Sequence, residues 1–143
     1  MVDGIDLQII KELSNNARTS FMRIAKKLKL SESAIRKRVK KLENNNIIKS
    51  YSLIVDQAKI GYDNIALVGV DVEAEKYLYV GKKLRELDGI KYAASTTGDH
   101  MFMLEIIAKD NEHLTRICDN VKSINGVTRI CPAIIKDTIR GTL

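Results

Sequence analysis

The sequence predicts a two-domain α+β protein, on three observations. Residues 1–56 contain three segments with apolar side chains at helical spacing, and residues 64–143 contain a strand–helix–strand pattern twice. The third observation is the charge. Residues 1–56 carry 12 basic and 6 acidic side chains, whereas residues 57–143 carry 12 of each, so the net charge of +6 lies in the first part. This division is typical of a nucleic-acid-binding module joined to a neutral domain.

The first predicted helix follows Asp3. Ile5, Ile9 and Leu13 recur at i, i+4 and i+8 and form one apolar stripe. The Asp3 carboxylate is placed to cap the N-terminus of this helix. The pair Asn15–Asn16 is expected to end it, because asparagine tolerates the left-handed conformation.

Two further helices are predicted in quick succession. One begins after Ser20, a good N-cap, and runs to about Leu28. Leu30 and Ser31 form a short turn into the other, which covers residues 31–45. A helix, a short turn and a second helix, supported by a preceding third helix, form a helix-turn-helix arrangement of the winged-helix-like kind.

The helix over residues 31–45 has a sharply divided surface, with Ile35, Val39 and Leu42 on its apolar side. The opposite side carries basic residues toward the N-terminal end of the helix. This end can enter the major groove of double-stranded DNA, and the groove is about 12 Å wide. The candidate DNA-binding residues on this helix are Ser31, Ser33, Arg36, Lys37 and Lys40. Arg18, Thr19 and Lys49 are candidate phosphate contacts.

The run over residues 47–56 is rich in branched and aromatic residues and is predicted to be extended. Two interpretations remain open: a strand that flanks the helices, or an arm through which two copies associate. Residues 57–63, which include Gly61, are the predicted hinge. The DNA-binding domain with its following strand is therefore expected at 1–56 and a second domain at 64–143.

The second domain is predicted to be an internal duplication. Its expected elements are a strand over 65–72, a helix over 76–87, strands over 90–97 and 101–108, a helix capped by Asp110, and a strand over 127–135. The segment Leu87-Asp88-Gly89-Ile90 recurs as Ile124-Asn125-Gly126-Val127, 37 residues later. The order βαββαβ predicts a ferredoxin-like domain with both helices on one face of an antiparallel sheet.

The other face of this sheet is expected to be apolar and uncovered. Ile65 and Leu67 alternate with the buried-face residues of the first strand, and Met101, Met103 and Ile107 add to the same face from the third. An uncovered apolar face indicates association, and a two-fold homodimer with the sheets face to face is its simplest form.

Other classes of function lack their sequence signals. Cys118 and Cys131 show no metal-binding spacing and are interpreted as buried free thiols, and His100 and His113 are too scattered for a zinc site. No phosphate loop or nucleophile motif is present, so we expect no enzyme activity, no cofactor and no metal. With no apolar run long enough for a membrane and no signal peptide, we expect a cytoplasmic protein that does not bind membranes.

At these residues the chain resembles the Lrp/AsnC (feast/famine) transcription regulators. The segments that carry the resemblance are Asn16-Ala17-Arg18-Thr19, Ile24-Ala25-Lys26-Lys27-Leu28, residues 30–38, Lys41-Leu42-Glu43, and Thr97-Gly98-Asp99-His100. The resemblance implies homodimers, often assembled into octamers, that bind pseudo-palindromic DNA. It also implies regulation by a small ligand, commonly an amino acid, near the turn at residues 97–100.

The effector-binding candidates implied by the resemblance are Thr97, Gly98, Asp99 and His100. In the functional interpretation, the Gly98 N–H meets a ligand carboxylate and the Asp99 carboxylate accepts from an ammonium group. In the alternative, Gly98-Asp99 only makes a hairpin turn. The family commonly has Tyr-Asp where this chain has His100-Met101. A second hypothesis for the whole chain is an amino-acid-sensing module that acts on a partner protein, with incidental DNA binding.

Overall fold

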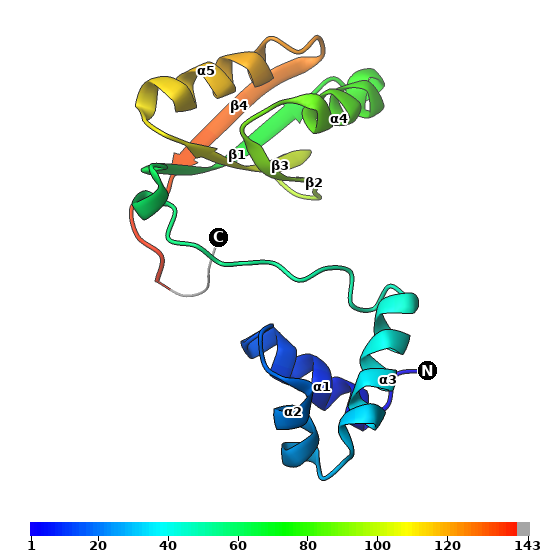
Figure 1. Cartoon of the computed structure of the whole chain (residues 1–143). Helices are drawn as coiled ribbons and strands as arrows, with labels where there is room; N and C mark the ends of the chain where they lie inside the picture. The colour runs from blue at the N-terminus through cyan, green and yellow to red at the C-terminus, as the bar shows by residue number, and fades with distance from the viewer. Residues whose placement is uncertain (140–143) are drawn as a thin grey trace. The chain divides into compact units, whose positions relative to one another are not determined.

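The computed structural model describes residues 1–139, which form two compact units. The first unit, Met1–Leu53, contains α1 (Gly4–Asn15), α2 (Phe21–Leu28) and α3 (Glu32–Asn44), as predicted (Figure 1). Apolar side chains of all three helices meet in one core, whose fully enclosed members are Ile9, Ile24 and Ile35. The helix-turn-helix arrangement is therefore a folded core and not only a sequence pattern.

Side-chain caps fix where the three helices begin. Asp3 accepts from the Asp6 backbone N–H at 2.9 Å, and Asp6 accepts from the Asp3 N–H at 3.1 Å, a reciprocal capping box. Ser20 caps α2 and Ser31 caps α3, each through its hydroxyl. Each cap satisfies one or two of the backbone N–H groups that the first turn leaves without a partner.

The predicted left-handed end of α1 is wrong. Asn16 is extended, with φ −155°, whereas Lys29 at the end of α2 has φ +56°. The chain must reverse within the three residues between α2 and α3, and the Leu30 N–H donates back to the Ala25 carbonyl at 3.0 Å across Lys29. The tight turn therefore requires the left-handed conformation at Lys29.

Residues 47–56, which are predicted to form a strand after α3, contain no strand in the structure of the single chain. A strand needs a neighbour that accepts and donates its backbone hydrogen bonds, and the first unit consists of helices. Five large apolar side chains of this segment are exposed: Ile47, Tyr51, Leu53, Ile54 and Val55. The Tyr51 hydroxyl donates to Glu43 at 2.8 Å; partial burial and this carboxylate raise the pKa of Tyr51 to about 12.

The second unit begins at Ile54. Its elements are η1 (Ala58–Ile60), β1 (Asn64–Val72), η2 (Ala74–Lys76), α4 (Tyr77–Glu86), β2 (Ile90–Ser95), β3 (Phe102–Ala108), α5 (Asn111–Lys122) and β4 (Val127–Ile134). The strands form one antiparallel sheet in the order β2-β3-β1-β4, and α4 and α5 cover one face (Figure 1). The predicted βαββαβ ferredoxin-like plan is confirmed. Residues 140–143 of the predicted second domain lie outside the described residues.

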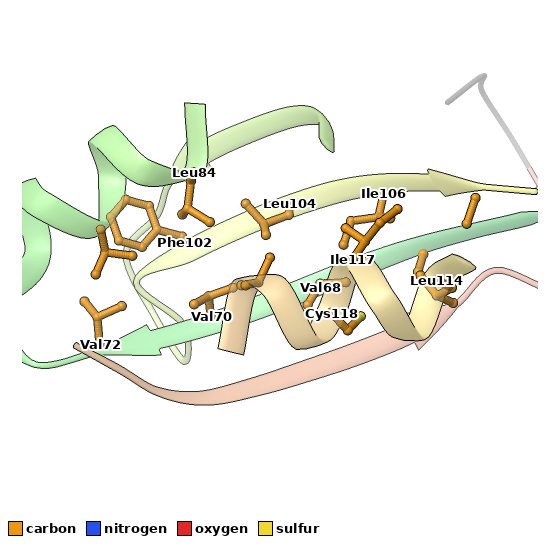
Figure 2. Close-up of a cluster of buried hydrophobic side chains, with 14 residues drawn as sticks. Val68, Val70, Val72, Leu84, Phe102, Leu104, Ile106, Leu114, Ile117 and Cys118 are labelled. Carbon is orange, nitrogen blue, oxygen red and sulfur yellow. The ribbon is translucent and has the colours of Figure 1, made fainter. Parts of the chain in front are cut away.

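The core of the second unit lies between the sheet and its two helices. Figure 2 shows Val68 and Val70 of β1 and Leu104 and Ile106 of β3 beside side chains of both helices. All four are at most 1% exposed. Burial of one such side chain contributes roughly 1.5–3 kcal/mol, so this layer is the main source of stability of the unit.

The duplication extends to the backbone and to the packing. Gly89 and Gly126, which are 37 residues apart, both have positive φ, +86° and +101°. A Cβ on Gly89 would overlap the Ile117 side chain of α5, and a Cβ on Gly126 would overlap Lys76 and contact Val80 of α4. Ile117 and Val80 are themselves 37 residues apart. The glycine of each repeat therefore packs against the helix of the other repeat, at equivalent positions.

The sheet face opposite α4 and α5 is largely apolar, and no helix among the described residues of the second unit covers it. Leu67 is 36% exposed, and Ile65, Met103 and Ile107 are half-buried. Met101 lies outside β3, which begins at Phe102, so the predicted third strand is one residue too long. We call this surface, formed by Ile65, Leu67, Met103, Glu105 and Ile107, the open sheet face.

The two cysteines differ from the prediction in one respect. Cys118 is a buried free thiol on α5, and burial raises its pKa, with a smaller contribution from Asp119. Cys131 is also free but only half-buried, because β4 is an edge strand with a single neighbour, β1. Within residues 1–139, no helix is long and apolar enough to cross a membrane, and no three His, Cys, Asp or Glu side chains are grouped to hold a metal.

Candidate nucleic-acid interface and effector turn

The outer face of α3 presents four of the predicted DNA-binding side chains: Ser33, Arg36, Lys37 and Lys40, all of them exposed. Ser31 lies at the start of the helix, where its Oγ accepts from the Ala34 N–H at 3.2 Å and lies 3.0 Å from the Ser33 Oγ. The two hydroxyl groups therefore lie together at the N-terminal end of the cationic face of α3. The positive end of the helix dipole lies at the same terminus, which favours an anionic partner there.

Arg36 is held by two neighbours before any ligand arrives. Its guanidinium donates to Glu32 at 2.7 Å, one turn earlier on α3, and its Cζ lies 5.2 Å from the centre of the Phe21 ring of α2. The exposed ion pair contributes little to stability, but the ring restricts the plane of the guanidinium. Sequence reasoning missed both contacts. The i, i+4 spacing of Glu32 and Arg36 is the signal for the first.

Lys37 and Lys40 have a different electrostatic role. Neither has an ion-pair partner within residues 1–139, whereas Lys27 is bound to Glu12 at 2.6 Å. A phosphate that meets these two ammonium groups competes with water alone and not with a carboxylate of the protein. Lys41, also on α3, is likewise exposed and has no ion-pair partner within residues 1–139. These three lysines are therefore cations on α3 that the protein leaves available to an anion.

The other candidate phosphate contacts lie away from α3. Asn16 organises the turn between α1 and α2: its side chain accepts from the Arg18 N–H at 2.9 Å, and its carbonyl accepts from the Thr19 N–H at 3.0 Å. Arg18 is exposed, Thr19 is half-buried, and Lys49 is exposed beyond the end of α3. The structure thus groups five of the eight candidates on α3 and places the remaining three on two flanking segments.

Arg38 is the basic residue of α3 that the protein uses internally. Its Nη1 donates to Asp3 and to Asp6, each at 2.7 Å, and Asp6 is only 5% exposed. The Asp6 backbone N–H, and then Arg38, lower the pKa of the Asp3 carboxyl below its ordinary value. The two carboxylates in turn raise the pKa of Arg38. This contact ties the start of α1 to the middle of α3.

Substituting Arg38 with methionine is expected to raise the pKa of Asp3 only part of the way to its ordinary value, because the Asp6 N–H remains as the larger cause. Carbon-detected NMR titration of the Asp3 carboxyl measures this shift. Since the pKa is lowered on folding, Asp3 stabilises the unit above about pH 4 and loses that contribution as pH falls through the folded-state pKa. An unchanged Asp3 titration in R38M would show that Arg38 does not lower the pKa of Asp3.

The predicted effector turn connects β2 to β3 over residues 96–101. Thr96 closes it, since its N–H donates to the Met101 carbonyl at 2.9 Å and its Oγ1 donates to the His100 carbonyl at 2.7 Å. Gly98 has φ +117°, which requires glycine, and no atom of the described residues lies within 4 Å of the position of a Cβ there. Thr97, Gly98 and Asp99 are exposed. The turn thus presents its tip to a potential ligand, whereas Thr96, which sequence reasoning did not select, holds it closed.

His100 points back from the turn onto β1. Its ring fills the space above Gly69, where any Cβ would overlap it, and its Nδ1 lies 3.1 Å from the Asp71 Oδ1. The Met101 N–H adds a backbone bond to the Val70 carbonyl at 3.2 Å. His100 therefore anchors the turn to the sheet. The absence of a side chain at Gly69, within an otherwise branched strand, is the sequence signal for this contact.

A helix-turn-helix unit with a cationic third helix, followed by a ferredoxin-like unit, defines a DNA-binding transcription regulator with a separate ligand-binding domain. The model of the AsnC-type helix-turn-helix domain matches residues 2–43, and that of the Lrp/AsnC ligand binding domain matches residues 65–140. The chain belongs to the Lrp/AsnC family of transcription regulators.

Individual relatives agree along the full length of the chain. It is 43% identical to the HTH-type transcriptional regulator LrpA of Pyrococcus horikoshii over 141 residues, which cover 98% of this chain and 100% of the relative. Among solved structures it is similar to E. coli AsnC, with TM-score 0.89, 25% identity and coverage of 100% and 97%. A Neisseria meningitidis transcriptional regulator, solved as an L-Met complex, has the same fold, with TM-score 0.91, 19% identity and coverage of 99% and 94%.

Proposed function

We propose that α3 contacts DNA in the major groove, with Ser31, Ser33, Arg36, Lys37 and Lys40 as its contact residues. Lys37 and Lys40 meet phosphates or base edges as free cations. Arg36 is oriented by the Phe21 ring, and its planar fork suits the two acceptors on the edge of a guanine. Arg18, Thr19 and Lys49 contact phosphates from the flanking segments. The observation that carries the proposal is the exposed pair Lys37 and Lys40 without ion-pair partners within residues 1–139.

The protein acts as a homodimer in this proposal, with the open sheet face as the contact between copies. Leu67 lies at the centre of that face, directly across from Glu105 in the strand pairing. Glu105 is only 8% exposed, and its Oε1 pairs with the Lys91 Nζ at 3.1 Å. A second copy of the face would cover the apolar side chains around this ion pair.

Two further parts of the proposal concern regulation. An amino acid is the proposed effector and the turn Thr97–His100 its site, in line with the Lrp/AsnC ligand binding domain and with the L-Met complex of the Neisseria relative. Dimers assemble further, up to octamers, and the regulator acts in the cytoplasm, where the chromosome lies. Dimerisation would present two α3 helices to successive major grooves, about 34–36 Å apart.

DNA binding is tested by alanine substitution of Lys37 and Lys40, singly and together, in a mobility-shift assay on selected genomic fragments at several salt concentrations. Each substitution is expected to reduce affinity and to lower the slope of log K against log salt by about 0.9, because one phosphate contact is lost. R36A is expected to reduce discrimination between bases as well as affinity, whereas K49A should weaken binding equally on all sequences.

The matched control is K122A, which removes an exposed lysine from the last turn of α5 in the second unit. It changes the net charge by the same amount, so it measures the loss that is due to charge alone. If K37A and K40A bind DNA no more weakly than K122A, α3 is not the DNA-contacting helix. If the unaltered protein itself selects no specific DNA, the result favours the second hypothesis, in which the chain acts on a partner protein.

A further inference from the structure

A cavity of about 270 Å³ lies between α4 and the edge strand β2, on the face of the sheet that carries the helices. It forms because the residues that face each other here are small. Gly81 lies on α4, and Ala93 and Ser95 lie on β2 opposite the buried Leu104 and Phe102. Ala93 is exposed although its cross-strand partner Leu104 is 1% exposed, so the helices leave this edge of the sheet uncovered.

The inner wall of the cavity is apolar and formed by buried side chains. Phe102 is 6% exposed and stacks on Tyr77, with ring centres 4.8 Å apart and an angle of 18° between the planes. Leu84, 2% exposed, points from α4 toward the sheet beside Phe102 (Figure 2). The volume is slightly below the roughly 300–1,000 Å³ of pockets for drug-sized ligands, so the cavity suits a small molecule with a short apolar group.

The mouth of the cavity is cationic. Lys82 and Arg85 line it from α4, three residues apart and therefore on the same side of the helix. Neither has an ion-pair partner in the part of the chain that the structure describes, whereas the neighbouring Lys83 is bound to Glu86 at 2.8 Å. Among residues 1–139, no acidic side chain lines the cavity. The site therefore offers two positive charges to an anion and no carboxylate to an ammonium group.

Gly81 is not explained by packing. A Cβ at this position would lie 3.4 Å from two atoms of the Phe102 ring, the shortest ordinary van der Waals separation, and the glycine has no positive φ. Glycine in the interior of a helix is destabilising relative to alanine. The residue therefore weakens α4 without relieving a clash, and its effect on the structure is to leave the cavity open.

We propose that this cavity binds a small organic carboxylate that has a short apolar group and no ammonium group, such as a branched 2-oxo acid. The carboxylate pairs with Arg85 and Lys82; Ser95, which also lines the cavity, donates a further hydrogen bond, and the apolar group lies against Phe102. An amino acid would bring an ammonium group that these residues leave without an anionic partner. The site is separate from the amino-acid site proposed at Thr97–His100 and does not depend on it.

The test measures binding of three molecules with the same isobutyl group to the full-length protein by isothermal titration calorimetry. They are 4-methyl-2-oxopentanoate, which is an anion only, leucine, which adds the ammonium, and 4-methylpentanamide, which is neutral. We expect the oxo acid to bind at one site per chain and the amide not to bind. Leucine should compete with the oxo acid for the site with an affinity at least roughly tenfold lower, because its ammonium group is desolvated without an anionic partner.

Three variants locate the site. R85Q is expected to weaken oxo-acid binding by about tenfold or more, since it removes a charge-assisted hydrogen bond. G81L should abolish binding by filling the cavity, and G81A, which contacts Phe102 without a clash, should raise the melting temperature and weaken binding less. K83Q is the control, because Lys83 lies on the same helix, is paired with Glu86 and does not line the cavity.

The proposal is overturned if the oxo acid does not bind at millimolar concentration, if R85Q and G81L leave its affinity unchanged, or if leucine displaces it with equal or greater affinity. Mobility shifts on the same samples separate this outcome from the DNA-binding proposal. A protein that binds DNA but no oxo acid contradicts only the cavity assignment.

Discussion

Substituting Leu67 with lysine is expected to convert the proposed dimer into a folded monomer. Leu67 lies at the centre of the open sheet face, opposite Glu105 on β3. In a single chain the new ammonium would pair with that carboxylate across the strands, so the fold should be retained. In a face-to-face dimer the substitution occurs twice. Each copy loses a buried leucine contact of roughly 1.5–3 kcal/mol, and a charge must be desolvated in addition.

For the two copies together we expect a loss of about 6 kcal/mol, or roughly 10⁴-fold in the dimer dissociation constant. Sedimentation equilibrium measures it, with far-UV circular dichroism as the check on folding. L7K is the matched control, because Leu7 is 60% exposed on α1 and takes no part in the open sheet face. If L67K and L7K sediment as the same oligomer as the unaltered protein, the copies associate through another surface.

Substituting Gly126 with alanine is expected to destabilise the second unit by about 2–6 kcal/mol. The residue has φ +101°, a conformation that costs an L-residue about 1–3 kcal/mol. Its new Cβ would also overlap the Cβ of Lys76, an atom attached directly to the backbone that cannot rotate away. Such overpacking adds typically 1–3 kcal/mol. Urea unfolding followed by circular dichroism measures the change in the free energy of unfolding.

Two other glycines of the unit separate the strain from the clash. Gly61 has φ +90° and no atom within 4 Å of the position of a Cβ, so G61A measures the backbone strain alone. In G89A the overlapping atom is the end of the Ile117 side chain, which can change rotamer. We expect the loss of stability to increase in the order G61A, G89A, G126A. Equal losses for G61A and G126A would show that the contact with Lys76 relaxes without cost.

Local residue chemistry explains why so much of the fold was predictable. Asp3, Ser20, Ser31 and Asp110 all cap helices in the structure, because a side chain that satisfies a backbone N–H acts within three residues of itself. The duplication was visible because two Asx-Gly pairs recur at the same distance. The predictions that differ from the structure concern properties that depend on neighbours. Residues 47–56 form no strand within a single chain, and Asn16 ends α1 as predicted but is extended rather than left-handed.

The sequence by itself determined the helix-turn-helix and βαββαβ plans, the cationic character of α3 and the family to which the chain belongs. These follow from periodicity, caps and charge, which are local along the chain. Only the tertiary structure decided which basic residues remain available. Arg38 is bound by Asp3 and Asp6, and Arg36 is oriented by Glu32 and Phe21. Lys37, Lys40 and Lys41 of α3 have no ion-pair partner within residues 1–139.

The same holds for the second unit. The order β2-β3-β1-β4 brings His100 onto Gly69 and leaves β2 at an edge that α4 covers incompletely. The cavity beside Gly81 and the anchored turn both result from contacts between residues far apart in the sequence. The amino-acid pattern therefore specifies which helices and strands form. Packing between these elements decides which side chains make contacts within the protein and which remain available to bind ligands.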